Sequence, residues 1–517
     1  MSDEKKAAAA SALQLERADL ALDHLQDVNL GDKALNDGAF EATAQEHNMG
    51  FVQAMKTYKR AAFWSALISA SIIMEGYDVT LLGSFYAYPS FRERYGEFLN
   101  EERGYQISAD WQTKFNCLGA FANICGAIFN GWATARFGHR IVLMGSFIFL
   151  TGSIFVSFFA PSIEILLLGQ FLCDLPWGVF ATTGPSYAAE VTPLAIRGYL
   201  TAYVNLCWCI GQFISAGVLK GLVSNPTQWG YRIPFAIQWV WPVPLFIATF
   251  LAPESPWFLV RTGNLDEAKK ALQRLSEKDL TTEIACMSFL SQITNGGALC
   301  YSGSFFFLQT GINAEAAYGI SLGGTGIAFV GTIISWFYIH RFGRRTIWLA
   351  GFGCLVVILW TIGFLALPSQ TKPLAWGQSL LCVVWLGAYS MSVGPIVYTI
   401  VSEIGSTRLR TQTVVLGRSI YYVGNIVCGG TIQPRLLSPG AWNAKGKTAL
   451  CWAALASLTY AWGYFRMFET RGRTFGELDF MFQKGVSARQ SANYVVDKHE
   501  VFATQDAREA RVADVKR

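Results

Sequence analysis

Charge is scarce in this sequence. Only 15% of its 517 residues are charged, whereas 52% are hydrophobic and the mean hydropathy is +0.31. A soluble globular chain carries about 25% charged residues. So little charge cannot cover the surface of a soluble protein of this size, and much of the surface must therefore face lipid. The same composition excludes collagen, coiled-coil, disordered and disulfide-scaffold chains.

Patterns that bind metals or perform catalysis are also lacking. The 11 cysteines are scattered, mostly in apolar stretches, without a CxxC pair, and there are only five histidines. We interpret the cysteines as small buried hydrophobic residues. The chain has no phosphate loop, nucleophile elbow or HExxH motif. The net charge of +5 is small and dispersed, so it does not indicate nucleic-acid binding. We expect no metal, no cofactor, no nucleic-acid partner and no enzyme activity.

Long hydrophobic stretches dominate from about Ala62 onward. Each is about 20 residues long and can cross ~30 Å of hydrocarbon as a helix. The runs 141–160 and 347–367 contain no charged residue. We predict an all-α integral membrane protein with twelve transmembrane helices. They are placed near 62–86, 112–134, 141–160, 163–185, 199–222, 232–252, 284–308, 317–339, 346–367, 376–400, 411–434 and 448–467.

The loops between these spans differ in positive charge. If both ends of the chain are cytoplasmic, the short inner loops carry eight arginines and the short outer loops only three basic residues. This satisfies the positive-inside rule and predicts cytoplasmic termini. The first 61 residues are polar and lack the apolar core of a cleavable signal peptide. We therefore predict a tail at 1–61, a six-helix lobe at 62–252, a linker at 253–283, a second lobe at 284–467 and a tail at 468–517.

Two motifs occur twice. The pattern R-F-G-H-R at 136–140 recurs as R-F-G-R-R at 341–345, and E-x6-R at 190–197 recurs at 403–410. The offsets are nearly equal, and each pair lies on the same predicted side of the membrane. A duplicated six-span unit is typical of a transporter with two pseudo-symmetric lobes and a site between them.

The repeated motifs also supply candidate gating residues. The glutamate and arginine of E-x6-R can pair on adjoining turns at the cytoplasmic ends of spans. Such pairs can latch the lobes when the cavity faces outward and open when it faces inward. The alternative is an ordinary stabilising ion pair. The candidates are Glu190, Arg197, Glu403, Arg410, Arg136 and Arg344.

The first span contains two acids on one helical face, Glu75 and Asp78. An acid at the bilayer centre costs about 2.5–3.5 kcal/mol on the insertion scale, so both should face a wet cavity or a cation. The plausible deep cation is Arg418 in span 11. We interpret Glu75, Asp78 and Arg418 as a proton-coupling group. A structural ion pair between the lobes is the alternative.

Span 11 carries a polar stripe that begins at Arg418 and follows one helical face. Amides, hydroxyls and aromatic rings are the groups that bind sugars. The same residue types could instead join spans or fill the core, and for Trp385 and Tyr389 both roles remain open. The candidate substrate-binding residues are Asn205 and Gln212 in span 5, Gln292 and Asn295 in span 7, Tyr398 in span 10, and Tyr421, Tyr422 and Asn425 in span 11.

Span 4 has a third polar face, formed by Gln170, Asp174 and Trp177 at i, i+4 and i+7. Asp174 is a third acid at membrane depth, beside Glu75 and Asp78. It is either a second titrating group or a partner for Arg418, and the sequence leaves both open.

These motifs together resemble the sugar porter branch of the major facilitator superfamily. The resemblance rests on G-Y-D at 76–78, the two R-F-G-x-R loops, P-E-S-P at 253–256, the two E-x6-R elements and E-T-R-G-R-T at 469–474. Further motifs resemble the fungal maltose and α-glucoside permeases within that branch. These are M-E-G-Y-D at 74–78, G-S-F-Y at 83–86, G-Q-F-L-C at 169–173 and P-W-G at 176–178.

The resemblance covers about 63–479 and implies the two-lobed fold of that superfamily. It implies uptake of an α-glucoside such as maltose at the plasma membrane, usually by proton symport, with sugar, protons and membrane lipid as partners. It places Asp78 at the proton-coupling acid and Glu75 at a cavity-lining position. Residues at sugar-contacting positions are Asn205, Gln212, Gln292, Tyr398, Tyr421 and Tyr422. A facilitative sugar uniporter and a non-transporting sugar sensor are the alternatives.

Several positions depart from the pattern of these permeases. Asn123 stands where they usually carry glutamate, Ala135 where the first inner loop has aspartate, and His139 where it has arginine. Gln170 stands where many sugar porters have an arginine that pairs with the first-span acid, and Arg418 is expected to take over that pairing. The linker of about 30 residues is also short for the family.

Overall fold

The computed structural model describes most of the chain between Phe51 and Tyr494. The described ranges are 51–100, 104–192, 194–252, 280–301, 303–309, 312–339, 341–368, 371–404, 410–438, 441–473 and 475–494. Most of the predicted first tail, nearly all of the linker and the end of the second tail lie outside these residues. The side chain of Arg410 lies outside them as well.

The first half of the structure covers 51–252 and is almost entirely helical. Its elements are α2 (Phe51–Thr57), α3 (Lys59–Ser69), α4 (Ile72–Phe85), α5 (Pro89–Tyr95), β1 (Glu97–Asn100), β2 (Gly104–Gln106), α6 (Ala109–Phe158), α7 (Ile163–Val191), α8 (Leu194–Leu222), α9 (Trp229–Ile237), η1 (Gln238–Val240) and α10 (Pro242–Leu251). The strands form a short antiparallel hairpin after the first span, which the sequence analysis did not anticipate.

The second half covers 280–494, and helices are the regular secondary structure of its described residues. Its elements are α13 (Leu280–Thr294), α14 (Gly297–Tyr301), α15 (Gly303–Gln309), α16 (Ala314–Tyr338), α17 (Arg344–Leu365), α18 (Lys372–Met391), α19 (Val393–Ile404), α20 (Arg410–Asn425), η2 (Ile426–Ile432), α21 (Gln433–Leu437), η3 (Lys445–Lys447), α22 (Thr448–Arg466) and α23 (Phe475–Gln483).

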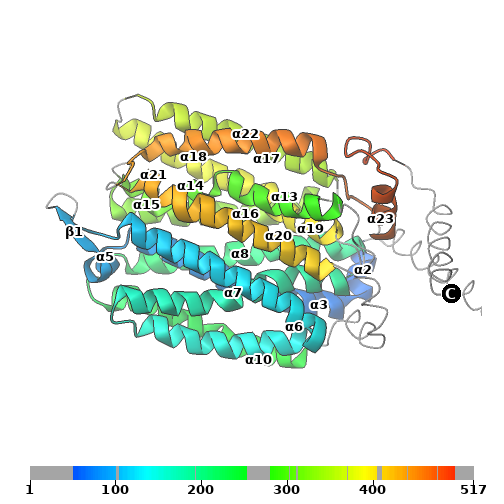
Figure 1. Ribbon diagram of the computed structural model, residues 1–517, viewed down its shortest axis with the longest axis horizontal. Helices are drawn as coiled ribbons and strands as arrows, with labels where there is room; N and C mark the ends of the chain where they lie inside the picture. Colours follow the sequence, from blue (N-terminus) through cyan, green and yellow to red (C-terminus); the bar gives the residue numbers. More distant parts are fainter. Residues whose placement is uncertain are drawn as a thin grey trace, which may run out of the picture.

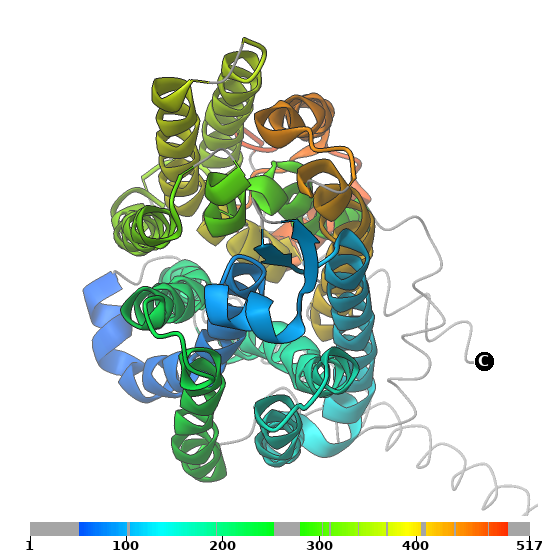
Figure 2. The ribbon, with the colours of Figure 1, turned by 90° about the vertical axis from the view of Figure 1, so that its left-hand side faces the viewer.

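The two halves form two helix bundles that lie side by side with roughly parallel long axes (Figures 1 and 2). They meet where α8 packs against α16 and α19, and where α20 packs against α6 and α7. One end of the molecule carries α5 and the β1–β2 hairpin, and the opposite end carries α2 and α23 (Figure 1). These are called the α5 end and the α23 end below.

The predicted twelve spans are confirmed. Eight helices within the described ranges are long and apolar enough to cross a membrane. One of them, α6, contains two spans, because Gly138 breaks the helix with φ 82°. The seventh span is divided into α13, α14 and α15, the eleventh runs from α20 through the π-helical segment η2 to α21, and the twelfth is α22. Because of these breaks, the seventh and eleventh spans are made of helices that are each too short to be counted among the eight.

The outer surface of the bundles is apolar. Phe337 is 74% exposed and Leu458 is 70% exposed, and many other large hydrophobic side chains are exposed on the spans. In water such a surface would drive aggregation, whereas in a bilayer it contacts lipid tails.

Two glycines fix the position of the first span. An added Cβ would lie 2.3 Å from the carbonyl oxygen of Trp208 at Gly76, and 2.0 Å from that of Ile73 at Gly211. A side chain at either position would therefore push α4 away from α8. Small residues allow such close approach of helices in membranes. This close contact holds α4, and with it Glu75 and Asp78, against α8.

Candidate functional site

A cavity of about 200 Å³ lies between the two halves. Its lining is rich in acids, amides and phenols, whereas the outer surface is apolar. The polar residues that line it from the first half are Glu75, Asp78, Tyr86, Asn116, Asn123, Gln170, Asp174 and Asn205. Those from the second half are Gln292, Tyr389, Tyr398, Arg418, Tyr421, Tyr422, Asn425 and Gln433.

An ion pair joins the halves across this cavity. Nη2 of Arg418 in α20 donates to Oε1 of Glu75 in α4 at 2.8 Å, and both side chains are almost completely buried. Arg418 also donates to the hydroxyls of Tyr422 at 3.2 Å and Tyr398 at 3.3 Å, and its guanidinium lies 4.4 Å from the ring centroid of Tyr421. The cation is thus satisfied by one carboxylate and two phenols. The indole of Trp208, which lines the same cavity, also lies beside the Glu75 carboxylate.

The second acid of α4, Asp78, is held differently. Its Oδ2 accepts hydrogen bonds from Gln170 at 2.5 Å and Trp177 at 3.2 Å, and its Oδ1 accepts one from Gln238 at 2.6 Å. All three donors are neutral and belong to the first half. The predicted group of two acids and one cation therefore divides into a Glu75–Arg418 pair between the halves and an Asp78 cluster within the first half.

Asp174 also lines the cavity, from α7. Asn123 Nδ2 of α6 lies 3.5 Å from its Oδ1. The polar contacts of Arg418 in the described structure are with Glu75, Tyr398 and Tyr422. Of the two roles left open for Asp174, partnership with Arg418 is therefore not the one seen.

Most of the predicted substrate-binding residues come together at the cavity. Those that line it are Asn205, Gln292, Tyr398, Tyr421, Tyr422 and Asn425. Two lie elsewhere. Gln212 lines a separate cavity of about 30 Å³ with Thr80. Asn295 is fully buried, and its Oδ1 accepts a hydrogen bond from the backbone nitrogen of Gly297 at 2.9 Å, in the break between α13 and α14.

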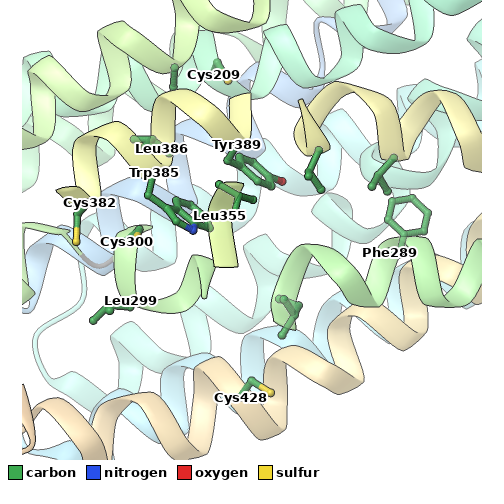
Figure 3. Close-up of a cluster of buried hydrophobic side chains, with 14 of the residues drawn as sticks. Cys209, Phe289, Leu299, Cys300, Leu355, Cys382, Trp385, Leu386, Tyr389 and Cys428 are labelled. Carbon is green, nitrogen blue, oxygen red and sulfur yellow. The ribbon is translucent and has the colours of Figure 1, made fainter. Parts of the chain in front are cut away.

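Trp385 and Tyr389 lie on α18 with parallel rings, 5.3 Å apart between centroids and 3° between planes. Figure 3 shows the two rings stacked among buried side chains such as Leu355 and Leu386. Tyr389 also lines the cavity, whereas Trp385 belongs to the core behind it. Trp385 therefore fixes the orientation of the Tyr389 ring.

The candidate gating residues of the second half lie at the α23 end. Nη2 of Arg344 donates to Oε1 of Glu403 at 3.0 Å, and the hydroxyl of Thr470 donates to Oε2 at 2.6 Å. Glu469 accepts hydrogen bonds from the backbone nitrogens of Arg344 at 2.8 Å and Arg345 at 3.2 Å, at the start of α17. The network ties α17 and α19 to the segment that follows α22.

The first half has a related arrangement. Nε2 of His139 lies 3.6 Å from Oε2 of Glu190, and Nη2 of Arg197 donates to the carbonyl oxygen of Thr192 at 3.2 Å. Arg136 is exposed and lies over the ring of Phe137. In both halves, the glutamate of E-x6-R lies against the fourth residue of R-F-G-x-R.

Direct contacts join the halves on both sides of the cavity. Toward the α5 end, the hydroxyl of Tyr318 donates to the carbonyl oxygen of Ser84 at 2.6 Å. Toward the α23 end, the hydroxyl of Thr201 donates to that of Thr399 at 3.2 Å. The described state therefore holds the cavity between two points of contact.

Some polar groups of the site were not identified from the sequence. Gln238 binds Asp78 from η1, and Trp208, Asn116 and Gln433 line the cavity. An amide in the otherwise apolar sixth span was the available signal for Gln238. Helical spacing was an available signal for two of the others, because Asn116 lies seven residues before Asn123 and Trp208 lies three residues after Asn205.

Comparisons with known proteins agree with this geometry. The Sugar (and other) transporter family model matches residues 64–285 and 280–482. A maltose permease of Saccharomyces cerevisiae is 34% identical over 527 residues, covering 94% of this chain and 85% of the relative. A general alpha-glucoside permease of S. cerevisiae is 34% identical over 512 residues, covering 91% and 83%.

Solved structures show the same fold. The proton:xylose symporter XylE bound to 6-bromo-6-deoxy-D-glucose matches with a TM-score of 0.69 and 17% identity, covering 82% of this chain and 99% of that chain. The inward-open XylE from E. coli matches with a TM-score of 0.59 and 19% identity, covering 81% and 98%. The likeness extends over both halves.

Proposed function

The chain belongs to the sugar porter family of the major facilitator superfamily, in its fungal maltose and α-glucoside permease type, and on that premise we propose that it takes up an α-glucoside by proton symport. Membership of this family makes the chain a multi-pass membrane protein of the sugar permease class. The α-glucoside, the proton and the direction of transport are the proposed parts.

The observation that carries the proposal is the cavity between the halves. Its amides and phenols can pair with sugar hydroxyls, and rings such as Tyr389 and Tyr421 can stack on sugar C–H faces. At about 200 Å³ it is smaller than the pockets of about 300–1,000 Å³ that enclose drug-sized ligands. A disaccharide would therefore enter only when the halves separate at one end, as alternating access requires. The proposed contacts are Asn205, Gln292, Tyr398, Tyr421, Tyr422 and Asn425, with Gln212 and Asn295 as further candidates.

Asp78 is the proposed proton-coupling acid. As a carboxylate it accepts all three hydrogen bonds from Gln170, Trp177 and Gln238. A proton on either oxygen competes with these donors, so protonation weakens the packing of α4 against α7 or η1. Because α4 also carries Glu75, which binds Arg418 of the other half, the proton on Asp78 and the pairing of the halves are coupled through one helix.

The proposed orientation puts both termini and the α23 end in the cytoplasm of the cell, with the protein in the plasma membrane. The arginine-rich loops lie at the α23 end, and the positive-inside rule favours this side. The Arg344–Glu403 pair and the His139–Glu190 contact then act at the cytoplasmic mouth. They hold neighbouring helices of one half together, and their opening would let that mouth widen.

The decisive experiment is uptake of labelled maltose and labelled glucose into proteoliposomes, with and without an imposed pH gradient. Proton symport of an α-glucoside predicts maltose accumulation that depends on the gradient, accompanied by proton entry when maltose is added. A uniporter would equilibrate the sugar without accumulation and without a pH change. A sensor would bind maltose without transport. Either result would overturn the proposal.

A further inference from the structure

Asp174 is the least compensated acid of the cavity. It is 7% exposed, and its described hydrogen bond, from Asn123 Nδ2, is long at 3.5 Å. Its other oxygen lies against the backbone of α6, since an added Cβ on Gly119 would lie 2.5 Å from Oδ2. The glycine therefore makes room for a carboxyl group at this place.

The charges around Asp174 do not balance. Three acids line the cavity, and the cation that lines it with them is Arg418, which binds Glu75 at 2.8 Å. Asp78 accepts three hydrogen bonds from neutral donors, whereas Asp174 shares Gln170 with Asp78, has a long contact to Asn123 and pairs with no cation in the described structure. An ionised Asp174 would stand near two other carboxylates in a buried site, which is unfavourable unless a proton neutralises one of them.

Titratable and charged groups near Asp174 come from α4, from its own helix and from α20. Those of α4 are Glu75, Asp78 and Tyr86. On its own helix Cys173 is adjacent, and α20 brings Arg418 to the cavity. From α6 come Asn123 and the Gly119 backbone, neither of which titrates. The titratable groups near Asp174 in the described structure are therefore acids, apart from Arg418, which is already bound to Glu75.

A separate feature indicates that a polar ligand reaches this region. The hydroxyl of Tyr86 is buried and lines the cavity, and no described residue hydrogen-bonds to it. Buried polar atoms normally bind a partner or water, so water or a sugar hydroxyl is the expected partner of the Tyr86 hydroxyl. Water in this cavity would give protons access to Asp174, which lines it too.

We propose that Asp174 is a second proton-binding site, and that its proton is carried together with the sugar and with the proton of Asp78. This inference rests on the proposed function. When protonated, Asp174 can donate a hydrogen bond to a sugar oxygen, so sugar and proton stabilise each other in the cavity. When the cavity opens toward the side with fewer protons, Asp174 gives its proton to water and the sugar leaves.

The test is the number of protons that move with each maltose. In proteoliposomes with the membrane potential held at zero by potassium and valinomycin, a gradient of one pH unit balances a maltose ratio of about tenfold for one proton and about a hundredfold for two. We expect a zero-flux ratio of about a hundredfold for the wild type and about tenfold for Asp174→Asn. Asp110→Asn, which changes an exposed acid of α6, is the control and should behave as the wild type.

A double variant distinguishes loss of the carboxyl group from misfolding. Asn123→Asp combined with Asp174→Asn moves the carboxyl group across the 3.5 Å contact and should restore the hundredfold ratio. Maltose exchange, which needs no net proton movement, checks that each variant folds. A wild-type ratio of about tenfold, or a hundredfold ratio in Asp174→Asn, would overturn the inference while symport stands. Loss of exchange in both Asp174 variants would indicate a structural role and also overturn it. A wild type that does not accumulate maltose would refute the proposed function itself.

Discussion

His139 takes the place in the first half that Arg344 takes in the second. Its Nε2 lies 3.6 Å from Glu190, whereas Arg344 lies 3.0 Å from Glu403. Histidine is charged only when protonated, whereas arginine is always charged. The Arg344–Glu403 contact is therefore a permanent ion pair, whereas the His139–Glu190 contact is an ion pair only when the histidine is protonated.

His139→Arg should convert the second contact into a permanent ion pair. If the pair holds the α23 end closed, the variant should favour the closed state by about 1 kcal/mol and slow maltose turnover about fivefold, while maltose binding stays similar. Turnover and KM in proteoliposomes measure the effect. His139→Gln, which carries no charge, is the matched control. Equal turnover in the arginine variant and the wild type would contradict a gating role for this contact.

Glu403→Gln should destabilise the protein, because it leaves the buried Arg344 without its carboxylate partner. Removal of one member of a buried ion pair costs about 3–5 kcal/mol. We expect a lower midpoint of thermal unfolding in detergent, followed by tryptophan fluorescence. Thr470→Val removes the other described hydrogen bond of Glu403 without leaving a charge unpaired, and should lower the midpoint less. A larger effect from the threonine variant would be inconsistent with the ion pair as the main contact.

The Glu75–Arg418 pair can be tested by a double-mutant cycle. Glu75→Gln and Arg418→Met should each lower the midpoint of thermal unfolding, because each leaves the other member of the buried ion pair without its partner. The double variant should recover much of the stability, since an apolar replacement of both partners is often neutral. It should still fail to transport maltose, because the contact that joins α4 to α20 across the cavity is missing. Additive losses of stability would show that the two side chains do not depend on each other.

The Glu75–Arg418 contact could be predicted from the sequence, although the two residues are 343 positions apart. Charge is so rare in the spans that a buried acid has few possible partners, and lipid tolerates few unpaired charges. The twelve spans were predictable for the same reason, since their length and low charge are set by the bilayer.

The contacts at the α23 end were not predictable in the same way. The E-x6-R spacing predicts a pair between Glu403 and Arg410, whose side chain lies outside the described residues. In the structure Arg344, 59 residues away in the sequence, binds Glu403. Glu190 likewise lies against His139. Helix ends from distant parts of the chain meet at one end of the bundle, and the spacing within one helix does not report which ends are neighbours.

Helical periodicity identifies a face but not a depth. Asn205 and Gln212 are seven residues apart and share a face of α8, yet about 10 Å separates them along the axis. Asn205 lines the larger cavity and Gln212 the smaller one. Gln238 shows the opposite problem, because it binds Asp78 from a span in which no polar stripe marks it.

Asp78→Asn should abolish maltose accumulation driven by a pH gradient. Asparagine keeps the size of the side chain and one acceptor oxygen, so the hydrogen bonds from Gln170, Trp177 and Gln238 are only partly lost, and maltose counterflow should persist. Both assays on the same proteoliposomes separate coupling from binding. Accumulation equal to that of the wild type would remove Asp78 from the coupling step.

Alanine substitutions can separate the two cavities. Asn425→Ala removes an amide that lines the larger cavity, and the loss of one sugar hydrogen bond of about 1 kcal/mol should raise the KM for maltose about fivefold. Gln212→Ala should have a smaller effect, because Gln212 lines the smaller cavity in the described state. Initial rates of maltose uptake measure both, with exchange rates as a check on folding. If Gln212→Ala raised KM as much as Asn425→Ala, the sugar would have to contact Gln212 directly, and the two cavities would have to join during transport. An unchanged KM in Asn425→Ala would instead remove the polar stripe of α20 from the sugar site at this position.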